Sequence, residues 1–205
     1  VATRIQERTG VPTSYKNILI SAGGQAGLYA SHTAVCNPGD RALYLDPYYT
    51  TYPSTISGVA AIPVPVQTHT EDAFQPRVED LDAAAAGATS LLINSPNNPT
   101  GTVYSRQTLE GIADVCKRHD LWLISDEVYD TQVWEGEHIS PRALPGMAER
   151  TLVVSSMSKS HAMTGSRVGW ICAPEHVIER LIDLATNTTY GVAGFIQDAT
   201  EFALG

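Results

Sequence analysis

The chain has 205 residues, and its 22 acidic residues outnumber its 13 basic ones, which gives a formal net charge of −9. Because the positive groups are few and scattered, they cannot neutralise a phosphate backbone or an anionic bilayer, so neither nucleic acid nor membrane is expected as a partner. A hydrophobic content of 43% and a charged content of 17% are typical of a globular protein.

The cysteines and the N-terminal residues bear on the cellular compartment of the protein. Cys36, Cys116 and Cys172 are widely spaced, odd in number and lack a CxxC unit, so we expect neither a disulfide framework nor a metal site. No apolar run approaches 18 residues, and the opening VATRIQERTG has no signal-peptide core. These features favour a reducing cytoplasm. The chain also begins without Met, and we expect a fragment or a processed product.

Short, nearly continuous apolar runs predict strands. Runs of this length without polar alternation are typical of strands covered on both faces, as in mostly parallel sheets. The predicted strands occupy residues 17–21, 41–45, 90–94, 121–125, 151–155 and 168–173.

Helical patterns lie between and after these runs. One helix is expected behind a cap at Ser105, another after Pro174, and the alanine-rich segment 82–87 is expected to end a helix at Gly87. Alternating strands and helices predict a three-layer α/β/α sandwich with a mostly parallel sheet. The predicted buried faces consist of Leu109, Ile112, Ala113 and Cys116 in the first helix, and of Val177, Ile178, Leu181, Ile182 and Ala185 in the second.

Polar or glycine-rich turns follow four of the predicted strands. In open α/β sheets, ligands bind outside the carboxyl ends of the strands, so four such turns predict one shared site. The turns read AGGQAG, SPNNPTG, DEVYD and SMSKS.

Each turn has a plain structural interpretation beside a functional one. The glycine turn aims backbone N–H groups at an anion such as phosphate, or is only a tight turn; it matches neither GxGxxG nor GxxxxGK[ST]. Asn98 is a turn residue or an amide donor to a ligand, and Asp126 caps a turn or serves the site through a buried carboxylate. Lys159 is a solvated loop lysine or, among small serines and near Arg167, an amine that forms a Schiff base.

Together these segments resemble the pyridoxal-phosphate-dependent aminotransferases of fold type I, in the class I/II, aspartate aminotransferase-like branch. The matching stretches occur in family order across residues 20–170. Three further tracts are similar to arginine–pyruvate transaminases: KRHDLWLISDEVYD, EGEHISPRALPGMAERT and SKSHAMTG. The stretches that carry the family resemblance are AGGQAGL, NPGD, DPYYTTYP, SPNNPTG, SDEVY and SMSKSHAMTGSRVGW.

The resemblance implies roles for the catalytic residues. Lys159 is expected to hold pyridoxal 5′-phosphate as a Schiff base and, once displaced by substrate, to move the proton at the substrate Cα. Asp126 is expected to pair with the pyridine nitrogen and keep it protonated. Asn98 and Tyr129 are expected to bond the ring's 3-oxygen.

The resemblance also implies the residues around the phosphate and the ring face. Gly24 and Gln25 are expected to hold the phosphate through backbone amides, Ser156 through its hydroxyl and Arg167 through its guanidinium. Tyr49 is expected to stack on the ring, although an aromatic residue there also suits core packing.

The implied function is transfer of an amino group from an amino acid to a 2-oxo acid. The alternatives are a lyase on the same cofactor and a non-catalytic, cofactor-binding regulatory domain. Residues 1–205 are expected to form the cofactor-binding large domain, truncated at both ends, without the family's N-terminal segment and C-terminal small domain. The full-length protein is expected to be a homodimer, and the isolated chain to be poorly active.

Overall fold

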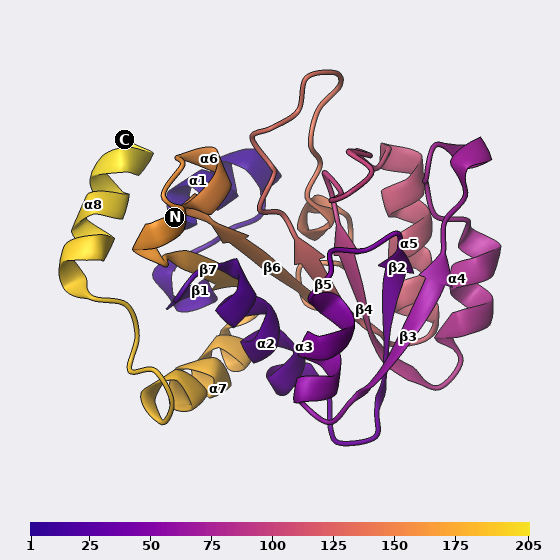
Figure 1. Cartoon of the computed structure of the whole chain (residues 1–205), viewed down its shortest axis with the longest axis horizontal. Coiled ribbons are helices and arrows are strands. Elements are labelled where there is room, and N and C mark those ends of the chain that lie inside the picture. The colour runs from indigo at the N-terminus through magenta and orange to yellow at the C-terminus, as the bar shows by residue number, and fades with distance from the viewer.

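A computed structural model describes all 205 residues as a seven-stranded sheet with helices on both faces (Figure 1). The strands are β1 (Ile18–Ser21), β2 (Arg41–Asp46), β3 (Ile62–Gln67), β4 (Ala88–Asn94), β5 (Trp122–Asp126), β6 (Thr151–Ser156) and β7 (Gly169–Cys172). The α-helices are α1 (Ala2–Thr9), α2 (Gly24–Val35), α3 (Tyr52–Gly58), α4 (Val78–Ala85), α5 (Arg106–Arg118), α6 (Met157–Ser160), α7 (Glu175–Thr186) and α8 (Gly194–Leu204). Short 3₁₀ turns lie at Tyr15–Asn17, Thr70–Asp72, Pro141–Ala143 and Thr164–Ser166.

The sheet runs in the order β1-β7-β6-β5-β4-β2-β3. Only β7 is antiparallel to its neighbours, β1 and β6, and every other adjacent pair is parallel. The mostly parallel sheet is therefore confirmed, and all six predicted strands are present.

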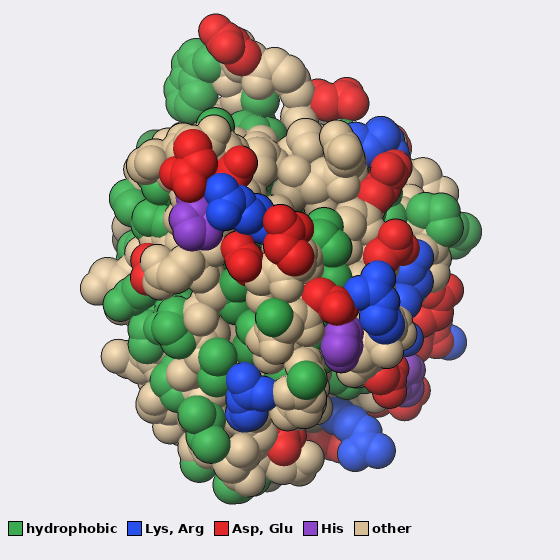
Figure 2. All heavy atoms as spheres, turned by 90° about the vertical axis from the view of Figure 1, so that its right-hand side faces the viewer, with side chains coloured by type: hydrophobic (Ala, Val, Ile, Leu, Met, Phe, Trp, Pro, Cys, Tyr) green, Lys and Arg blue, Asp and Glu red, His purple; other side chains and the backbone are tan.

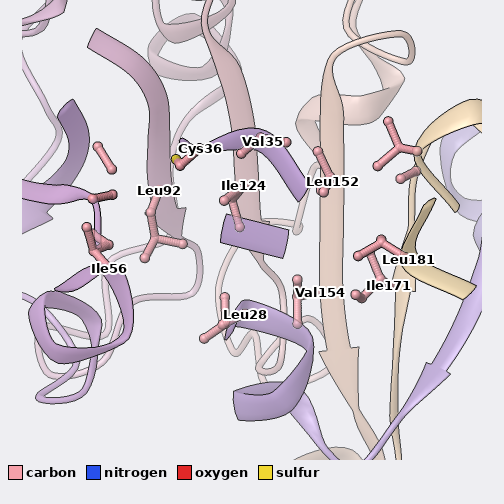
Figure 3. Close-up of a cluster of buried hydrophobic side chains, with 14 of the residues drawn as sticks. Leu28, Val35, Cys36, Ile56, Leu92, Ile124, Leu152, Val154, Ile171 and Leu181 are labelled. Atoms are coloured by element: carbon pink, nitrogen blue, oxygen red, sulfur yellow. The ribbon is translucent and has the colours of Figure 1, made fainter. Parts of the chain in front are cut away.

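Side-chain alternation along the strands builds one core on each face of the sheet. In β2, Ala42 and Tyr44 join the core beneath α2, α3 and α7, whereas Leu43 and Leu45 join the core beneath α4 and α5. Figure 3 shows the first core, where Leu28 of α2 lies close to Ile124 and Val154 of the central strands. Two apolar layers on one buried sheet make the predicted α/β/α sandwich.

The strand that the sequence patterns missed is β3, whose segment IPVPVQ contains Pro63 and Pro65. Because proline cannot donate to a strand ladder, it is confined to edge strands. β3 is that edge, since it pairs only with β2. Ile62 and Thr68 donate to Asp40 and Asp46, respectively, so the alternate positions, where the prolines lie, face the free edge.

The predicted helices are confirmed, but two residues of one predicted buried face are not buried: Ile182 and the partly exposed Ala185. Ser105 caps α5, accepting from Thr108 N at 3.1 Å, and Gly87 follows α4 with a positive φ of 70°. In α7, Ile182 was predicted to be buried but is 47% exposed. The buried stripe of α7 is narrow, with Val177, Ile178 and Leu181 as its buried residues, and the main contacts of the helix are with α2, β1 and the turn that precedes β1.

A third, smaller cluster covers the outer end of the sheet. Met157, Val168 and Trp170 form its centre, and residues of α1 and α8 pack around them. Figure 1 shows α8 beyond β1 and β7 at one end of the molecule. No helix is both long and apolar enough to cross a membrane.

The opposite end of the molecule carries mixed charges. Figure 2 shows acidic and basic side chains interspersed on the face that includes α4. Ion pairs account for several of them, including Arg77 with Glu71 and Asp72, and Arg118 with Asp82. No basic tract gathers on this face, in keeping with the composition.

Candidate active site

The four turns predicted to share one site meet beside a single cavity. Since β7 alone is reversed, the carboxyl ends of β1, β4, β5 and β6 point to the same edge of the sheet. The cavity there measures about 190 Å³. All nine predicted site residues line it: Gly24, Gln25, Tyr49, Asn98, Asp126, Tyr129, Ser156, Lys159 and Arg167.

Asp126 is the last residue of β5 and lies buried at the inner wall of this cavity. Its carboxylate accepts from Tyr52 Oη at 2.8 Å and from Val128 N at 3.2 Å. Burial raises the pKa of Asp126 to about 6, against the lowering effect of these two hydrogen bonds, and the charge of Glu127 adds to the rise. A carboxylate in this state favours a cationic partner.

Two residues around Asp126 were absent from the predicted set. Tyr52 of α3 is only 2% exposed, and its ring lies edge-on to Tyr49 with 5.8 Å between centroids. Asn94 donates to Asp126 O at 3.0 Å and accepts from Asn98 N at 2.8 Å, so it joins the β4 turn to the end of β5. The tyrosine-rich stretch DPYYTTYP contained the signal for Tyr52, but only the fold aims its hydroxyl at Asp126.

The lysine lies on the outer side of the cavity. Lys159, near the end of α6, has its Nζ 5.8 Å from the centre of the Tyr129 ring. Asn98 Nδ2 donates to Tyr129 Oη at 3.4 Å. An amine, a phenol and an amide therefore occupy one side of the cavity, and Asp126 lies among the same lining residues.

The amino end of α2 forms an anion cradle. The N–H groups of Gly24, Gln25 and Ala26 bond no acceptor in the chain, because the acceptors they need would lie beyond the helix start. Ser156 lies opposite, where its Oγ is 4.0 Å from the position that a Cβ on Gly24 would take. Free N–H groups at a helix start attract a phosphate or carboxylate.

Arg167 completes the cradle from an unusual backbone position. It has a φ of 50°, and its guanidinium donates to Thr164 O at 2.9 Å and to Ala22 O at 3.3 Å. These bonds hold it across Gly23, where an added Cβ would come within 2.4 Å of Nη2. With its own φ of 87°, Gly23 is therefore required on both steric and conformational grounds.

The Gln25 side chain is occupied elsewhere, so only its backbone N–H faces the cradle. Its amide accepts from Thr51 Oγ1 at 2.8 Å and donates to Thr55 Oγ1 at 2.7 Å. These bonds tie α2 to the start of α3, which carries Tyr52. Gly169 of β7 permits a second close approach: its Cβ would meet Ser155 O at 2.6 Å and Gly23 C at 2.8 Å.

The fold and this site define an α/β protein with a cavity suited to a small anionic ligand at the carboxyl ends of parallel strands. The chain belongs to the class I and II aminotransferase family, whose model matches residues 1–205.

Individual relatives agree with this assignment. The chain is 42% identical to an arginine–pyruvate transaminase of Pseudomonas aeruginosa, over 100% of this chain and 52% of that protein. It is 35% identical to an aspartate/prephenate aminotransferase of Thermus thermophilus, over 100% of this chain and 53% of that protein. The chain thus spans about half the length of the curated relatives it matches.

Solved structures share the fold. An aspartate aminotransferase of Thermotoga maritima superimposes with a TM-score of 0.95 at 33% identity, covering 99% of this chain and 54% of that one. The Thermus thermophilus aspartate aminotransferase determined with maleate gives a TM-score of 0.93 at 34% identity, covering 97% and 52%. Because these relatives are named aminotransferases, neither a lyase nor a regulatory domain is favoured.

Proposed function

We propose that this chain is the pyridoxal-phosphate-binding large domain of an aminotransferase that moves an amino group from an amino acid to a 2-oxo acid. The observation that carries the proposal is the placement of the buried Asp126 carboxylate and the Lys159 amine in one cavity, beside an anion cradle. Membership of the class I and II aminotransferase family supports it.

The residues fit the cofactor at both of its ends. The unbonded N–H groups of Gly24 and Gln25, with Ser156 and Arg167, suit a phosphate dianion. At the other end, Asp126 is a desolvated carboxylate that gains a partner from a protonated pyridine nitrogen. When bound, pyridoxal phosphate supplies an electron sink for the electron pair left at the substrate Cα.

Each side chain around the ring then has a task. Lys159 would anchor the cofactor through its amine and, once the substrate has displaced it, would move the proton from the substrate Cα to the cofactor carbon that carries the nitrogen. Asp126 would keep the ring nitrogen protonated. Asn98 and Tyr129, whose Nδ2 and Oη atoms are 3.4 Å apart, would donate to the ring oxygen, and Tyr49 would pack on the ring.

The proposal is tested with the cofactor itself. Titration of the chain with pyridoxal phosphate is expected to give the absorbance band of a lysine-bound cofactor. Borohydride reduction and peptide mapping should then place the pyridoxyl group on Lys159. Lys16→Ala and Lys117→Ala are matched controls, since Lys16 and Lys117 lie outside the cavity in surface ion pairs with Glu175 and Asp114. Labelling that persists in Lys159→Ala would exclude this lysine as the anchor.

The substrates are assigned by a screen of amino donors and keto acceptors with the full-length parent. Arginine with pyruvate is the first pair, and aspartate and prephenate are the next substrates, because the names of two relatives contain them. We further propose a homodimer, checked by light scattering. A cytoplasmic location is supported by three buried, unpaired cysteines and is checked by fractionation.

A further inference from the structure

A second buried carboxylate, Glu127, lies directly after Asp126 and has no part in the proposed chemistry. Its side chain is 7% exposed, and its partner His138 is 4% exposed. Adjacent strand positions point to opposite faces, so Glu127 lies on the side of Ser125, away from the cavity. A carboxylate without a task in the site and so far from solvent requires an explanation.

Both oxygens of Glu127 have partners. Oε1 accepts from Ser125 Oγ at 3.0 Å and from Ser140 Oγ at 2.7 Å, and Oε2 is 3.0 Å from His138 Nε2. Burial alone would raise the pKa of Glu127, but attraction to His138 and the hydrogen bonds outweigh it and lower the pKa. The group is therefore held as a carboxylate, hydrogen-bonded to His138 and to two serine hydroxyls.

The backbone of Glu127 is fixed as well. Its N–H donates to Val154 O at 2.8 Å, and its carbonyl accepts from Ser155 Oγ at 3.2 Å, so the residue is bound to β6 from both sides. The same carbonyl accepts from Asp130 N at 3.0 Å and starts the turn that carries Tyr129. The position of Tyr129 thus depends on a turn that begins at Glu127.

The side chain of Glu127 also closes the loop that follows. Between the end of β5 and the 3₁₀ turn at Pro141–Ala143, the chain has no helix or strand, and Figure 1 shows this loop projecting from the sheet edge. Its tip is open to solvent, with Trp134 86% exposed. His138 and Ser140 bring the returning arm back to Glu127, which removes much of the freedom of the loop.

We propose that Glu127 is a positioning residue, whose side chain ties the returning arm of the loop 127–140 to the end of β5 and thereby fixes Tyr129 against Asn98 and Asp126. The inference rests on the proposed function, because these three residues are its ring-binding groups. A gain in stability alone is a weak explanation for this cluster. The attraction within a buried charged pair offsets its desolvation cost poorly, and apolar residues of similar volume often stabilise a fold as well or better.

The test compares Glu127→Gln with Glu137→Gln. Glu137 carries the same charge on the same loop but is exposed and has no ion pair or hydrogen bond. Hydrogen exchange is measured over residues 127–140 without cofactor. Binding of pyridoxine phosphate, the alcohol analogue that cannot bond covalently to Lys159, is measured by fluorescence titration, and binding of inorganic phosphate by calorimetry.

Glu127→Gln is expected to speed exchange in the loop and to weaken pyridoxine phosphate binding by about tenfold, which corresponds to ~1.4 kcal/mol. Phosphate affinity should not change, because Gly24, Ser156 and Arg167 lie on other elements. Glu137→Gln should match the wild type in all three measurements. If Glu127→Gln folds poorly, the double variant Glu127→Gln, His138→Gln, which replaces the carboxylate and the imidazole together, is measured instead.

The outcomes separate the two proposals. Unchanged binding of pyridoxine phosphate by the variant overturns the positioning role, even where loop exchange is faster, because the cluster is then only structural. Equal loss of phosphate and pyridoxine phosphate binding also overturns it, since the damage is then general. A wild-type protein that binds no pyridoxine phosphate overturns the proposed function and this inference with it.

Discussion

The hydroxyl of Tyr52 donates a 2.8 Å hydrogen bond to the carboxylate of Asp126, and both groups are buried. The bond joins α3, which begins beside the anion cradle, to the end of β5. It is the one side-chain hydrogen bond that the Asp126 carboxylate receives, the other donor to that carboxylate being the backbone N–H of Val128. The protonation state of Asp126 therefore depends on Tyr52.

Tyr52→Phe is expected to destabilise the cofactor-free chain at pH 7.5 by ~1–3 kcal/mol, the range for a buried group that loses its partner. Because the hydrogen bond lowers the pKa of Asp126, its loss raises that pKa further, and the cost should shrink at pH 4, where the carboxyl is protonated. Urea unfolding at both pH values measures the difference. Tyr104→Phe is the control, since Tyr104 is equally buried but bonds no carboxylate.

Asp126→Asn is expected to remove the destabilisation that the buried carboxylate causes as pH rises. The folded-state pKa of about 6 lies above the ordinary 3.8, so the wild-type chain binds more protons than the unfolded chain between these values. The contribution of Asp126 to stability is therefore highest below pH 3.8 and is lost as pH rises through about 6. Relative to wild type, the variant should gain up to ~3 kcal/mol between pH 4 and pH 7.5. A gain that does not grow with pH would contradict the raised pKa.

The same variant tests the catalytic proposal. In the full-length protein, Asp126→Asn should still bind pyridoxal phosphate through Lys159 and the anion cradle but lose most turnover, because the ring nitrogen no longer has an ionic partner. Steady-state kinetics at saturating cofactor provide the measurement. Wild-type turnover in this variant would disprove the role assigned to Asp126.

His32 of α2 produces the opposite pH dependence. Neither ring nitrogen has a hydrogen-bond partner, and burial lowers the pKa of His32 to about 4, below the ordinary 6.5. Its contribution to stability is present above pH 6.5 and is lost as pH falls towards 4. His32→Leu should therefore increase the free energy of unfolding relative to the wild type, and this increase should be ~2 kcal/mol larger at pH 5 than at pH 8. Urea unfolding at both pH values provides the measurement. His176→Leu, at an exposed position of the helix α7, is the control for loss of a histidine that is not buried.

Gly169→Ala is expected to destabilise the chain by ~1–3 kcal/mol, the usual cost of overpacking. The added methyl would press on the backbone of Ser155 and Gly23, neither of which can move without shifting β6 or the start of α2. Affinity for inorganic phosphate should fall as well. Gly165→Ala is the matched control near the same site, since nothing lies within 4 Å of its Cβ position. Equal stability of both variants would show that the backbone around Gly169 shifts to accommodate the added methyl group.

Local patterns in the sequence were sufficient for the sandwich and for the meeting of four turns at one edge of the sheet, whereas the nine site residues came from the family resemblance and their roles stay predictions. Apolar runs without alternation mark strands buried on both faces, and strand direction brings their polar exits to one edge. The patterns failed at β3, where prolines break the apolar run. They also failed at Ile182, because helical spacing indicates which residues share a face of the helix but not how much of that face the neighbouring elements bury.

Only the tertiary structure decided which groups act on one another. Tyr52 and Asp126 are 74 positions apart, and the carboxylate of Glu127 reaches His138 and Ser140 across a loop whose path no local pattern specifies. The sequence by itself determined which chemical groups leave the strands, since strand period and turn chemistry are local properties. Their hydrogen-bond partners and pKa shifts depend on burial and on contacts between distant segments, which exist only once the chain has folded.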